Sequence, residues 1–488
     1  MASKEIDMKA LSAAAQACVV KMREAKVNEA CIRTFVAQHG MVSRGESGSI
    51  PDSAILPIES LDALDELSAE CDNDVLQSTV VLKLNGGLGT GMGLHDAKTL
   101  LEVKDGKSFL DFTALQVQYL RQHCSEHLRF MVMDSFSTTT STKRFLEGRY
   151  PWLHEVFESE VELMQNQVPK ILQDTLEPAT WAADPSCEWT PPGHGDIYTA
   201  LYGSGKLQEL VQRGYRYMFV SNGDNLGATL DSRVLAYMEA KEIDFLMEVC
   251  RRTESDKKGG HLARQATPAS GAAKAGLLLL RESAQCPKAD MDSFQDIHKY
   301  AFFNTNNLWV RLPALLATME ERGGTLPLPV IRNEKTVDPA DSASPAVYQL
   351  ETAMGAAITM FERASAIAVP RSRFAPVKTC ADLLALRSDA YVVTPDFRLV
   401  LDDRRHGEPP LITLDNAHYK MMSGFEKLVQ RGVPSLVQCE RVSVKGLVQF
   451  GADNVLTGAV AIENPNSAST YVIADGTTLT DTTATPSS

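Results

Sequence analysis

The stretch Val80-Val-Leu-Lys-Leu-Asn-Gly-Gly-Leu-Gly-Thr-Gly-Met-Gly93 indicates the fold of this chain most directly. Its apolar beginning, from Val80 to Leu84, is the pattern of a strand that is buried on both faces. Five glycines then follow closely, at positions 86, 87, 89, 91 and 93. Glycine at this density stabilises neither strand nor helix, but it lets the backbone turn sharply and bring N–H groups close to a ligand. A strand that leads into such a loop is how α/β proteins hold phosphate.

Two well-known phosphate-binding motifs do not fit this loop. No register of its glycines gives GxGxxG, and Ala97 precedes Lys98-Thr99 where GxxxxGK[ST] requires a glycine. A glycine-rich loop after a strand is often only a tight connection, and this interpretation stays open from the loop alone. If the loop binds phosphate, it belongs to a third group.

The composition narrows the class of partner. The chain has 488 residues, of which 44% are hydrophobic and 23% charged, as in an ordinary globular protein with room for roughly two or three domains. The formal net charge of −14 argues against nucleic acid or an anionic membrane as the main partner. Small phosphorylated substrates remain compatible with it, since a few local Lys and Arg residues suffice to hold them. No apolar run reaches the length of about 18 residues that a membrane span needs.

The cysteines and the N-terminus favour a cytoplasmic location. The nine cysteines are an odd number, are widely scattered and form no CxxC pair, which fits reduced thiols better than a disulfide framework or a zinc site. The first residues, Met-Ala-Ser-Lys-Glu-Ile-Asp, contain no apolar region typical of a secretory signal.

Apolar patterns predict the order of elements. Two helices are expected within residues 7–39, with Gly40 ending the second, and the Ser-, Gly- and Pro-containing residues 43–56 predict a linker. The predicted strands are 80–84, 128–133, 217–221, 245–249, 277–280 and 306–311, and the predicted helices are 109–124, 196–213, 232–241 and 348–362. This alternation favours an α/β fold with a mixed, mostly parallel sheet and helices on both faces. The small residues of 266–276 predict a mobile surface loop.

Polar clusters follow several of the apolar runs. Asn222-Gly-Asp-Asn225 follows the strand at 217–221, Asn304-Thr-Asn-Asn307 follows Phe302-Phe303, and Gly193-His-Gly-Asp196 opens a helix. Each cluster alone is compatible with a simple turn. Ligands of such sheets bind outside the carboxyl ends of the strands, so the shared position of the clusters predicts a common site.

The C-terminal part has a different pattern. A helix at 381–386 is followed by short β segments at 391–393, 399–401, 442–450, 455–456, 460–462 and 471–473. Separated by Gly, Asn and Asp, they predict the turns of an irregular parallel β-solenoid. The acidic, Thr-rich tail after Asp475 is expected to be too frayed for a subunit interface, so we expect a monomer.

Five motifs resemble the UTP–glucose-1-phosphate uridylyltransferases, which are also called UDP-glucose pyrophosphorylases. The motifs are LKLNGGLGTGMG with Lys98, PPGHGD around His194, VSNGDN around Asp224, FNTNN around Asn304, and the segment Arg371-Ser-Arg-Phe-Ala-Pro-Val-Lys378-Thr-Cys380. The resemblance covers nearly the whole chain, with the motifs in the same order. It implies a Rossmann-like nucleotidyltransferase domain at 43–380, preceded by a helical region at 1–42 and followed by a left-handed parallel β-helix at 381–488. It also implies that UTP and glucose 1-phosphate are converted reversibly to UDP-glucose and pyrophosphate, with Mg²⁺.

The same resemblance implies roles for individual residues. Lys98 and Lys378 would contact phosphates and Asp224 would hold Mg²⁺, and these three are the expected catalytic residues. Gln165 would read the uracil edge. The other expected substrate-binding residues are Leu84, Asn85, Gly86, Gly87, Gly193, His194, Gly195, Asn222, Gly223, Gly260, Glu282, Phe303, Asn304 and Asn306.

The chemistry suits these residue types. A sugar-phosphate oxygen that attacks the α-phosphorus of UTP is already ionised, so the main obstacle is repulsion between two polyanions. Two lysines, a metal-binding carboxylate and backbone N–H groups would offset that repulsion.

Other functions remain open from the sequence. One is a uridylyltransferase of broader range, which would accept galactose or N-acetylhexosamine 1-phosphate. Another is a non-catalytic nucleotide-sugar sensor, although a pure binder would not need both lysines together with Asp224. A β-solenoid acyltransferase is excluded, because there are no regular hexapeptide repeats and because His406 and His418 lie outside the solenoid-like segment.

Overall fold

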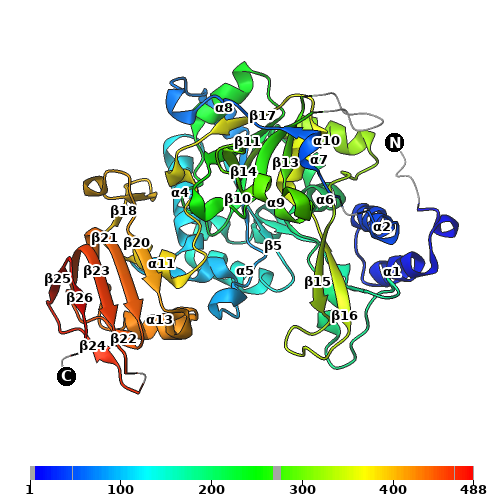
Figure 1. The fold of residues 1–488 in the computed structure, drawn as a ribbon. Coiled ribbons are helices and arrows are strands. Elements are labelled where there is room, and N and C mark those ends of the chain that lie inside the picture. The colour runs from blue at the N-terminus through cyan, green and yellow to red at the C-terminus, as the bar shows by residue number, and fades with distance from the viewer. Residues whose placement is uncertain (1–5, 47, 267–275, 467, 487–488) are drawn as a thin grey trace.

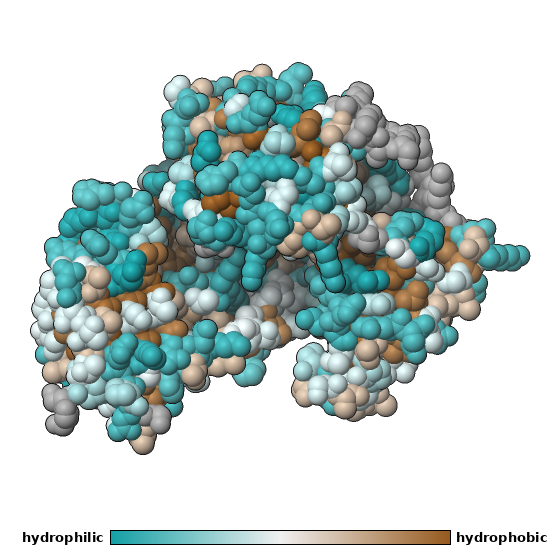
Figure 2. Space-filling model, in the orientation of Figure 1, coloured by the Kyte–Doolittle hydropathy of each residue, from teal (hydrophilic) through white to brown (hydrophobic). Residues whose placement is uncertain are grey.

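The computed structural model describes residues 6–46, 48–266, 276–466 and 468–486. A pair of N-terminal helices and a group of C-terminal strands lie on opposite sides of a central α/β domain (Figure 1). Figure 2 shows a mostly hydrophilic surface on this face, with apolar side chains gathered over the C-terminal strands. In the part of the chain that the structure describes, no helix is long and apolar enough to cross a membrane. The predicted loop 266–276 falls outside the described residues except at its two ends.

The N-terminal helices are α1 (Ala13–Glu24) and α2 (Glu29–Ser43), which confirms the predicted pair. The predicted end at Gly40 is wrong, because α2 continues through Val42 to Ser43. Val42 is buried in the same small core as Phe35, so one more turn adds apolar contacts that outweigh the cost of an interior glycine.

The central sheet is mixed, as predicted, with parallel strands at its centre. Its order is β1-β12-β14-β10-β2-β5-β6, with β13 beside β12 and with β11 between β14 and β17. The strands are β1 (Ile55–Leu56), β2 (Thr79–Leu84), β5 (Arg129–Asp134), β6 (Glu162–Met164), β10 (Tyr217–Asn222), β11 (Phe245–Arg251), β12 (His261–Gln265), β13 (Leu278–Arg281), β14 (Phe302–Arg311) and β17 (Ala364–Ala368). Neighbours among β10, β2, β5 and β6 are parallel, whereas β14 is antiparallel to β10, β11 and β12. The predicted linker 43–56 thus contributes an edge strand, β1, to the sheet.

Helices cover both faces of this sheet, which confirms the predicted layers. On β2, Val80 and Leu82 belong to the core on one face and Val81 to the core on the other. The first core includes residues of α6 (Ile197–Gly203), α7 (Lys206–Gln212) and α10 (Leu312–Glu321), and the second includes residues of α4 (Phe109–His123), α5 (Thr139–Arg149) and α8 (Ser232–Ala240). A strand buried on both faces is what the apolar run at 80–84 predicts.

Two predicted helices are wrong. The helix expected at 196–213 is interrupted at Ser204–Gly205, so α6 and α7 are separate helices. The segment 348–362 is a strand, β16 (Ala346–Glu351), followed by the 3₁₀ helix η13 (Met354–Met360). Val347, Leu350 and Met354 are buried at a spacing that imitates a helix. The segment instead pairs with β15 (Ile331–Thr336) and β8 (Ile171–Leu172), so tertiary pairing overrides the local pattern.

The C-terminal strands stack in parallel. They are β20 (Leu411–Leu414), β21 (Ser435–Lys445), β23 (Val455–Glu463), β25 (Thr478–Thr480) and β26 (Thr483–Ala484), with β22 (Val448–Gln449) beside β24 (Tyr471–Val472). Before this stack come α11 (Cys380–Arg387) and an antiparallel hairpin of β18 (Tyr391–Val393) and β19 (Leu399–Leu401), so the segments 391–393 and 399–401 are not solenoid turns. The prediction of a frayed tail after Asp475 is also wrong, because β25 and β26 continue the pairing on β23.

Candidate active site

The carboxyl ends of four parallel strands bring the predicted site residues together. Leu84, the last residue of β2, is in register with Asn222 of β10 on one side and with Met133 of β5 on the other. On the next strand, Met164 of β6 is opposite Asp134 of β5. The glycine loop, the Asn222–Asn225 turn and Gln165 therefore meet at one edge of the sheet.

The glycine loop presents N–H groups at this edge. The carbonyl oxygens of Gly86 and Gly87 accept hydrogen bonds from Ser135 Oγ and from the Lys98 backbone N–H, each at 3.0 Å. Among the described residues, no acceptor contacts the N–H of Gly86 or the N–H of Gly87. A Cβ at Gly86 would lie 2.7 Å from Gln165 Oε1, so only glycine fits there without moving Gln165. The loop thus offers two adjacent donors beside an amide side chain.

The side chain of Asn85 holds the start of the glycine loop through hydrogen bonds. Its side-chain amide is buried and donates to Asp134 at 2.6 Å and to Thr142 at 2.8 Å, while its carbonyl oxygen accepts a hydrogen bond from Thr99. Burial raises the pKa of Asp134 to about 7. Asn85 therefore fixes the exit of β2 against β5, and its side chain is occupied by the protein itself.

Gln165 is held in one orientation. Its backbone N–H donates to Asp134 at 2.7 Å, and its Nε2 donates to the carbonyl of Gly193 at 2.9 Å. Gly193 has a φ of +78°, and a Cβ there would lie 2.6 Å from the Thr352 carbonyl oxygen, so both conformation and space require glycine. Nε2 is engaged, whereas Oε1 accepts no hydrogen bond from the residues that the structure describes.

His194 is a neutral donor. Its Nδ1 accepts the backbone N–H of Met354 at 3.0 Å, so the proton of the neutral ring is on Nε2. Burial lowers the pKa of His194 to about 4, so the ring stays uncharged near neutral pH. Gly195 next to it donates its N–H to the Thr352 carbonyl at 2.8 Å.

The asparagine cluster lies inside β14, which corrects its expected place after a strand. Because β14 is antiparallel to β10, its N-terminal half extends past the carboxyl end of β10. The register against β11 shifts at this point, and Asn306 has a φ of +60°. Asn304 Nδ2 donates to Asn306 Oδ1 at 2.8 Å, and the Asn306 N–H donates back to Asn304 Oδ1 at 2.9 Å. This bulge places the two amides at the same edge as the other clusters.

Gly260 and Glu282 border the asparagines, but Phe303 does not join them. The Asn304 N–H lies 3.4 Å from the Gly260 carbonyl oxygen, and a Cβ at Gly260 would lie 2.4 Å from Glu282 Oε2. Burial raises the pKa of Glu282. The Phe303 side chain instead packs edge-on against Phe374, in the core on the other face of the sheet.

Lys98 and Asp224 are paired with each other. Their Nζ and Oδ2 atoms are 2.6 Å apart, and the two side chains are 18% and 19% exposed. Lys98 also donates to the carbonyl of Val377. Gly223, beside Asp224, donates its N–H to the Leu84 carbonyl at 3.0 Å, which fixes this turn against β2.

A metal would have one carboxylate here. No group of three or more His, Cys, Asp or Glu residues suited to a metal occurs within the described ranges. Asp224 is partly exposed at the sheet edge and is the available oxygen ligand. Mg²⁺ usually retains several waters and binds substrate phosphates, so a single aspartate fits Mg²⁺ better than a metal that needs a full protein cage.

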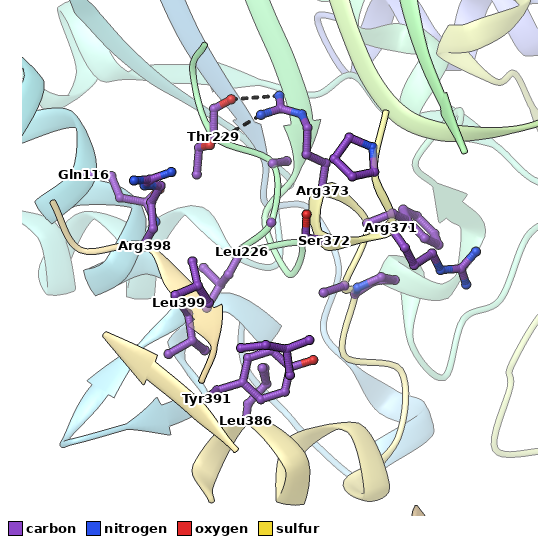
Figure 3. A pocket seen from close by; sticks show the side chains of 18 of the residues that line it. Gln116, Leu226, Thr229, Arg371, Ser372, Arg373, Leu386, Tyr391, Arg398 and Leu399 are labelled. Carbon is purple, nitrogen blue, oxygen red and sulfur yellow. Dashed lines mark hydrogen bonds between the residues drawn. The ribbon is translucent and has the colours of Figure 1, made fainter. Parts of the chain in front are cut away.

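Within the described residues, the ammonium group of Lys378 forms no hydrogen bond or ion pair with the residues at this edge. Its neighbour Val377 contacts Lys98, but Lys378 Nζ lies 5.9 Å from the centre of the Phe374 ring. Lys378 is exposed and lines a cavity of about 1290 Å³ between the central domain and the C-terminal segment. Figure 3 shows this cavity, into which Gln116, Arg398 and Tyr391 project. Of the three expected catalytic residues, the structure brings together Lys98 and Asp224 but not the ammonium group of Lys378.

Sequence reasoning missed a buried ion pair that holds the segment carrying Lys378. Arg373 Nε donates to Glu248 Oε2 at 2.8 Å, and both side chains are buried. Arg373 also donates to the Thr229 carbonyl at 2.9 Å (Figure 3). Asn225 accepts the N–H of Ala375 at 3.0 Å. Asn225 was detectable as part of the VSNGDN motif, whereas Glu248 lies in an apolar run and gave no signal.

Comparisons with known proteins are consistent with this geometry. The family model described as UTP--glucose-1-phosphate uridylyltransferase matches residues 31–457. A protein named UTP--glucose-1-phosphate uridylyltransferase from Saccharomyces cerevisiae is 39% identical over 388 residues, which are 79% of this chain and 74% of the relative. One of the same name from Musa acuminata is 35% identical over 415 residues, or 84% of this chain and 83% of the relative.

Solved structures agree with the sequence relatives. A mutant UDP-glucose pyrophosphorylase from Leishmania major in complex with UDP-glucose is 80% identical, with a TM-score of 0.93, and the match covers 98% of this chain and 100% of that one. The structure named UDP-glucose phosphorylase from Trypanosoma brucei is 57% identical, with a TM-score of 0.86 and the same coverage.

Proposed function

The chain belongs to the UTP–glucose-1-phosphate uridylyltransferase family, and we propose that it transfers the uridylyl group of UTP to glucose 1-phosphate, giving UDP-glucose and pyrophosphate. The observation that carries this proposal is the meeting of three elements at one sheet edge. They are the N–H groups of Gly86 and Gly87, which have no acceptor among the described residues, the oriented amide of Gln165, and the pair of Lys98 with Asp224.

Uracil would bind between the glycine loop and Gln165. Uracil has one N–H donor between two carbonyl acceptors, so the free Oε1 of Gln165 and the donors of Gly86 and Gly87 complement it. Leu84 and Gly193 would border the same space, because Leu84 ends β2 and the Gly193 carbonyl holds Gln165.

Glucose would bind on the side of His194 and the asparagines. Nε2–H of His194 donates, and the amides of Asn304 and Asn306 both donate and accept, so they suit sugar hydroxyls. Glu282 and Gly260 border this space, while Gly195, Asn222 and Gly223 would line the passage between sugar and phosphates. Phe303 would contribute only through its backbone or through packing, since its side chain lies on the other face.

The reaction needs positioning and charge compensation rather than a general base. A phosphate oxygen of glucose 1-phosphate attacks the α-phosphorus of UTP, an O–P bond forms, and the bond to the β-phosphate oxygen breaks so that pyrophosphate leaves with the electron pair. Lys98 would offset the charge on the triphosphate, and Lys378 would offset the charge on the two reacting phosphates. Asp224 would hold Mg²⁺, which when bound neutralises phosphate charge.

Lys378 would reach the site through a movement of its segment. Its side chain now lines the cavity beside Phe374, while Arg373 and Asn225 hold the segment at its base. The UDP-glucose pyrophosphorylase from Leishmania major has open and closed structures. A rotation near Val377 that accompanies closure would turn Lys378 toward the phosphates.

We also propose the domain division and the cellular setting. The division is a helical region at 1–42, a catalytic domain at 43–380 and a C-terminal domain at 381–488. Within the last, the parallel stack from β20 to β26 would form a left-handed β-helix, which the pairing on β21 and β23 supports. A monomer is supported by the short outer strands β25 and β26, which offer little edge for pairing. A cytoplasmic location is supported by the nine free cysteines.

Pyrophosphate release tests the proposed function. The protein is incubated with UTP, MgCl₂ and glucose 1-phosphate, and parallel reactions contain EDTA, galactose 1-phosphate or N-acetylglucosamine 1-phosphate. The proposal expects release with glucose 1-phosphate that is lost with EDTA. Equal turnover of the other sugars would replace it with the broader uridylyltransferase. Binding of UDP-glucose without any release would replace it with the nucleotide-sugar sensor.

A further inference from the structure

A buried carboxylate connects the two elements that hold Gln165. Asp196 is only 4% exposed, and its Oδ2 accepts the backbone N–H of Asn166 at 2.7 Å. The Asn166 side-chain amide donates to Asp196 Oδ1 at 2.8 Å and to Oδ2 at 3.0 Å. Within the described part of the chain, no Lys, Arg or His forms an ion pair with Asp196. A buried carboxylate whose hydrogen-bond partners among the described residues are all amides is costly for folding, so its presence calls for a reason.

The position of this carboxylate supplies a reason. Asn166 directly follows Gln165, and Asp196 closes the turn that contains Gly193 and His194. The Asn166–Asp196 bonds therefore fix the distance between the exit of β6 and this turn. Between the same two segments, Gln165 Nε2 donates a hydrogen bond to the Gly193 carbonyl at 2.9 Å. The orientation of the Gln165 amide thus depends on a spacing that Asp196 maintains.

Asn28 fixes the orientation of the Asn166 side-chain amide. Asn166 Oδ1 accepts a hydrogen bond from Asn28 Nδ2 at 2.5 Å, while Asn28 Oδ1 caps α2 by accepting the Cys31 N–H at 2.9 Å. Each amide therefore has its oxygen and its nitrogen assigned by a partner. Neither the Asn28 amide nor the Asn166 amide can flip without losing a hydrogen bond in the series that leads to Asp196.

The orientation of Gln165 matters because it distinguishes the two pyrimidines. Uracil has an N–H at position 3, which Oε1 accepts. Cytosine has a lone pair at position 3, which would face the same oxygen and be repelled. A glutamine free to flip would offer its NH₂ to cytosine instead, and the selectivity would be lost.

We propose that Asp196 is a positioning residue that sets the preference for uracil over cytosine nucleotides by holding Gln165, through Asn166, against the Gly193 carbonyl. The inference rests on the proposed function, and it adds a selectivity device that touches neither nucleotide nor sugar. It also gives the N-terminal helices a part in the site, because Asn28 belongs to the cap of α2.

The test compares UTP with CTP as substrates. For each variant, kcat/KM is measured with both nucleotides at saturating glucose 1-phosphate and MgCl₂, and the melting temperature is recorded. Asp196→Asn turns one acceptor into a donor that faces the donors of Asn166, so the ratio of kcat/KM for UTP to that for CTP should fall by about tenfold or more. Most of this change should come from a lower KM for CTP and a higher KM for UTP.

Two further variants keep the test decisive. Asn166→Ala leaves the backbone bond to Asp196 and removes the side-chain bonds to Asp196 and Asn28. It serves if Asp196→Asn does not fold, and the ratio should fall in the same direction. Asp111→Asn is the matched control, because Asp111 is an equally buried carboxylate that binds Arg149, Tyr150 and Ser108 at the start of α4. It should lower the melting temperature and leave the ratio unchanged.

The outcomes separate the inference from the proposed function. A folded Asp196→Asn or Asn166→Ala protein with the wild-type ratio would overturn the inference, even if its melting temperature is reduced. A wild-type protein that releases no pyrophosphate from UTP would instead overturn the proposed function.

Discussion

Lys98 and Asp224 form an ion pair across 126 positions of sequence, with Nζ 2.6 Å from Oδ2. Under the proposed function both residues would contact UTP and Mg²⁺. Binding would then separate the pair, with phosphate contacting the ammonium group of Lys98 and Mg²⁺ contacting the carboxylate of Asp224. The two side chains are only 18% and 19% exposed, so separating them is costly unless phosphate and a cation replace the lost partners.

Replacing Lys98 should impair catalysis far more than folding. We expect Lys98→Ala to lower kcat/KM for UTP by roughly 10²–10³, as for loss of a donor to developing charge. The free energy of unfolding should fall by about 1–3 kcal/mol, because the Asp224 carboxylate, only 19% exposed, loses its partner. A domain with a stability of about 5–15 kcal/mol stays folded after such a loss. Steady-state kinetics and urea denaturation measure the two effects. Activity close to that of the wild type would remove Lys98 from the phosphate site.

Substitutions at Gly87 and Gly91, in the same loop, test whether the nucleotide lies close to the loop backbone. A Cβ at Gly87 or at Gly91 would meet no atom within 4 Å, so neither Gly87→Ala nor Gly91→Ala should change the melting temperature much. If a nucleotide approaches the Gly87 backbone closely, the added methyl group should raise KM for UTP by about tenfold in Gly87→Ala, since an unavoidable clash of this kind costs about 1–3 kcal/mol. Gly91→Ala is the control. Equal KM values in both variants would contradict the predicted position of the nucleotide.

Lys378 should matter for kcat although it lies away from the site. We expect Lys378→Ala to lower kcat by roughly 10²–10³ with an unchanged melting temperature, because its exposed side chain contributes little to folding. Lys427→Ala, at an exposed position of α13 (Met422–Leu428), is the control for loss of a surface lysine. Near-normal turnover of Lys378→Ala would show that the segment does not move as proposed.

A buried histidine should make the fold sensitive to acid. His261 stacks on Tyr300 with ring centres 3.9 Å apart, and both of its ring nitrogens lack a partner among the described residues. Burial, assisted by the charges of Arg252 and Arg281, lowers the pKa of His261 to about 3. Below pH 6.5 the unfolded chain therefore binds a proton that the folded chain excludes, and stability falls as the pH drops toward 3.

His261→Phe should remove this loss. Between pH 7.5 and pH 4.5 the wild type should lose about 2.7 kcal/mol more of its free energy of unfolding than the variant, because about 1.4 kcal/mol is lost for each pH unit below 6.5. Urea denaturation at the two pH values measures the difference, with His298→Phe, at an exposed position nearby, as the control. Parallel pH dependence in wild type and His261→Phe would show that His261 is accessible to protons.

Local sequence patterns were sufficient to predict the elements at the sheet edge where the nucleotide is expected to bind. The apolar run before Asn85, the glycine loop and the turn at Asn222–Asn225 lie where the sequence places them, because strand burial and glycine content are local properties. The pattern at 348–362 failed because buried residues at helical spacing belong to a strand that pairs with β15. The spacing of apolar residues and the local strand propensity cannot reveal a pairing strand that lies elsewhere in the chain.

Side-chain direction and buried pairs were beyond the sequence. Glu248 and Arg373 are 125 positions apart, and neither pairs with a sequence neighbour, so no local signal predicts their contact. The direction of Lys378 depends on how its segment packs on Phe374. Asp196 is 30 positions from Asn166 in the sequence, so their contact becomes apparent only in the folded chain.

A crystal structure of the protein with UDP-glucose and Mg²⁺ tests the central claim most directly. The account predicts the uracil ring between Gln165 and the N–H groups of Gly86 and Gly87, with Lys98 withdrawn from Asp224 and directed at a phosphate. A nucleoside bound elsewhere, such as in the cavity beside Arg398 and Tyr391, with the Lys98–Asp224 pair intact, would contradict it.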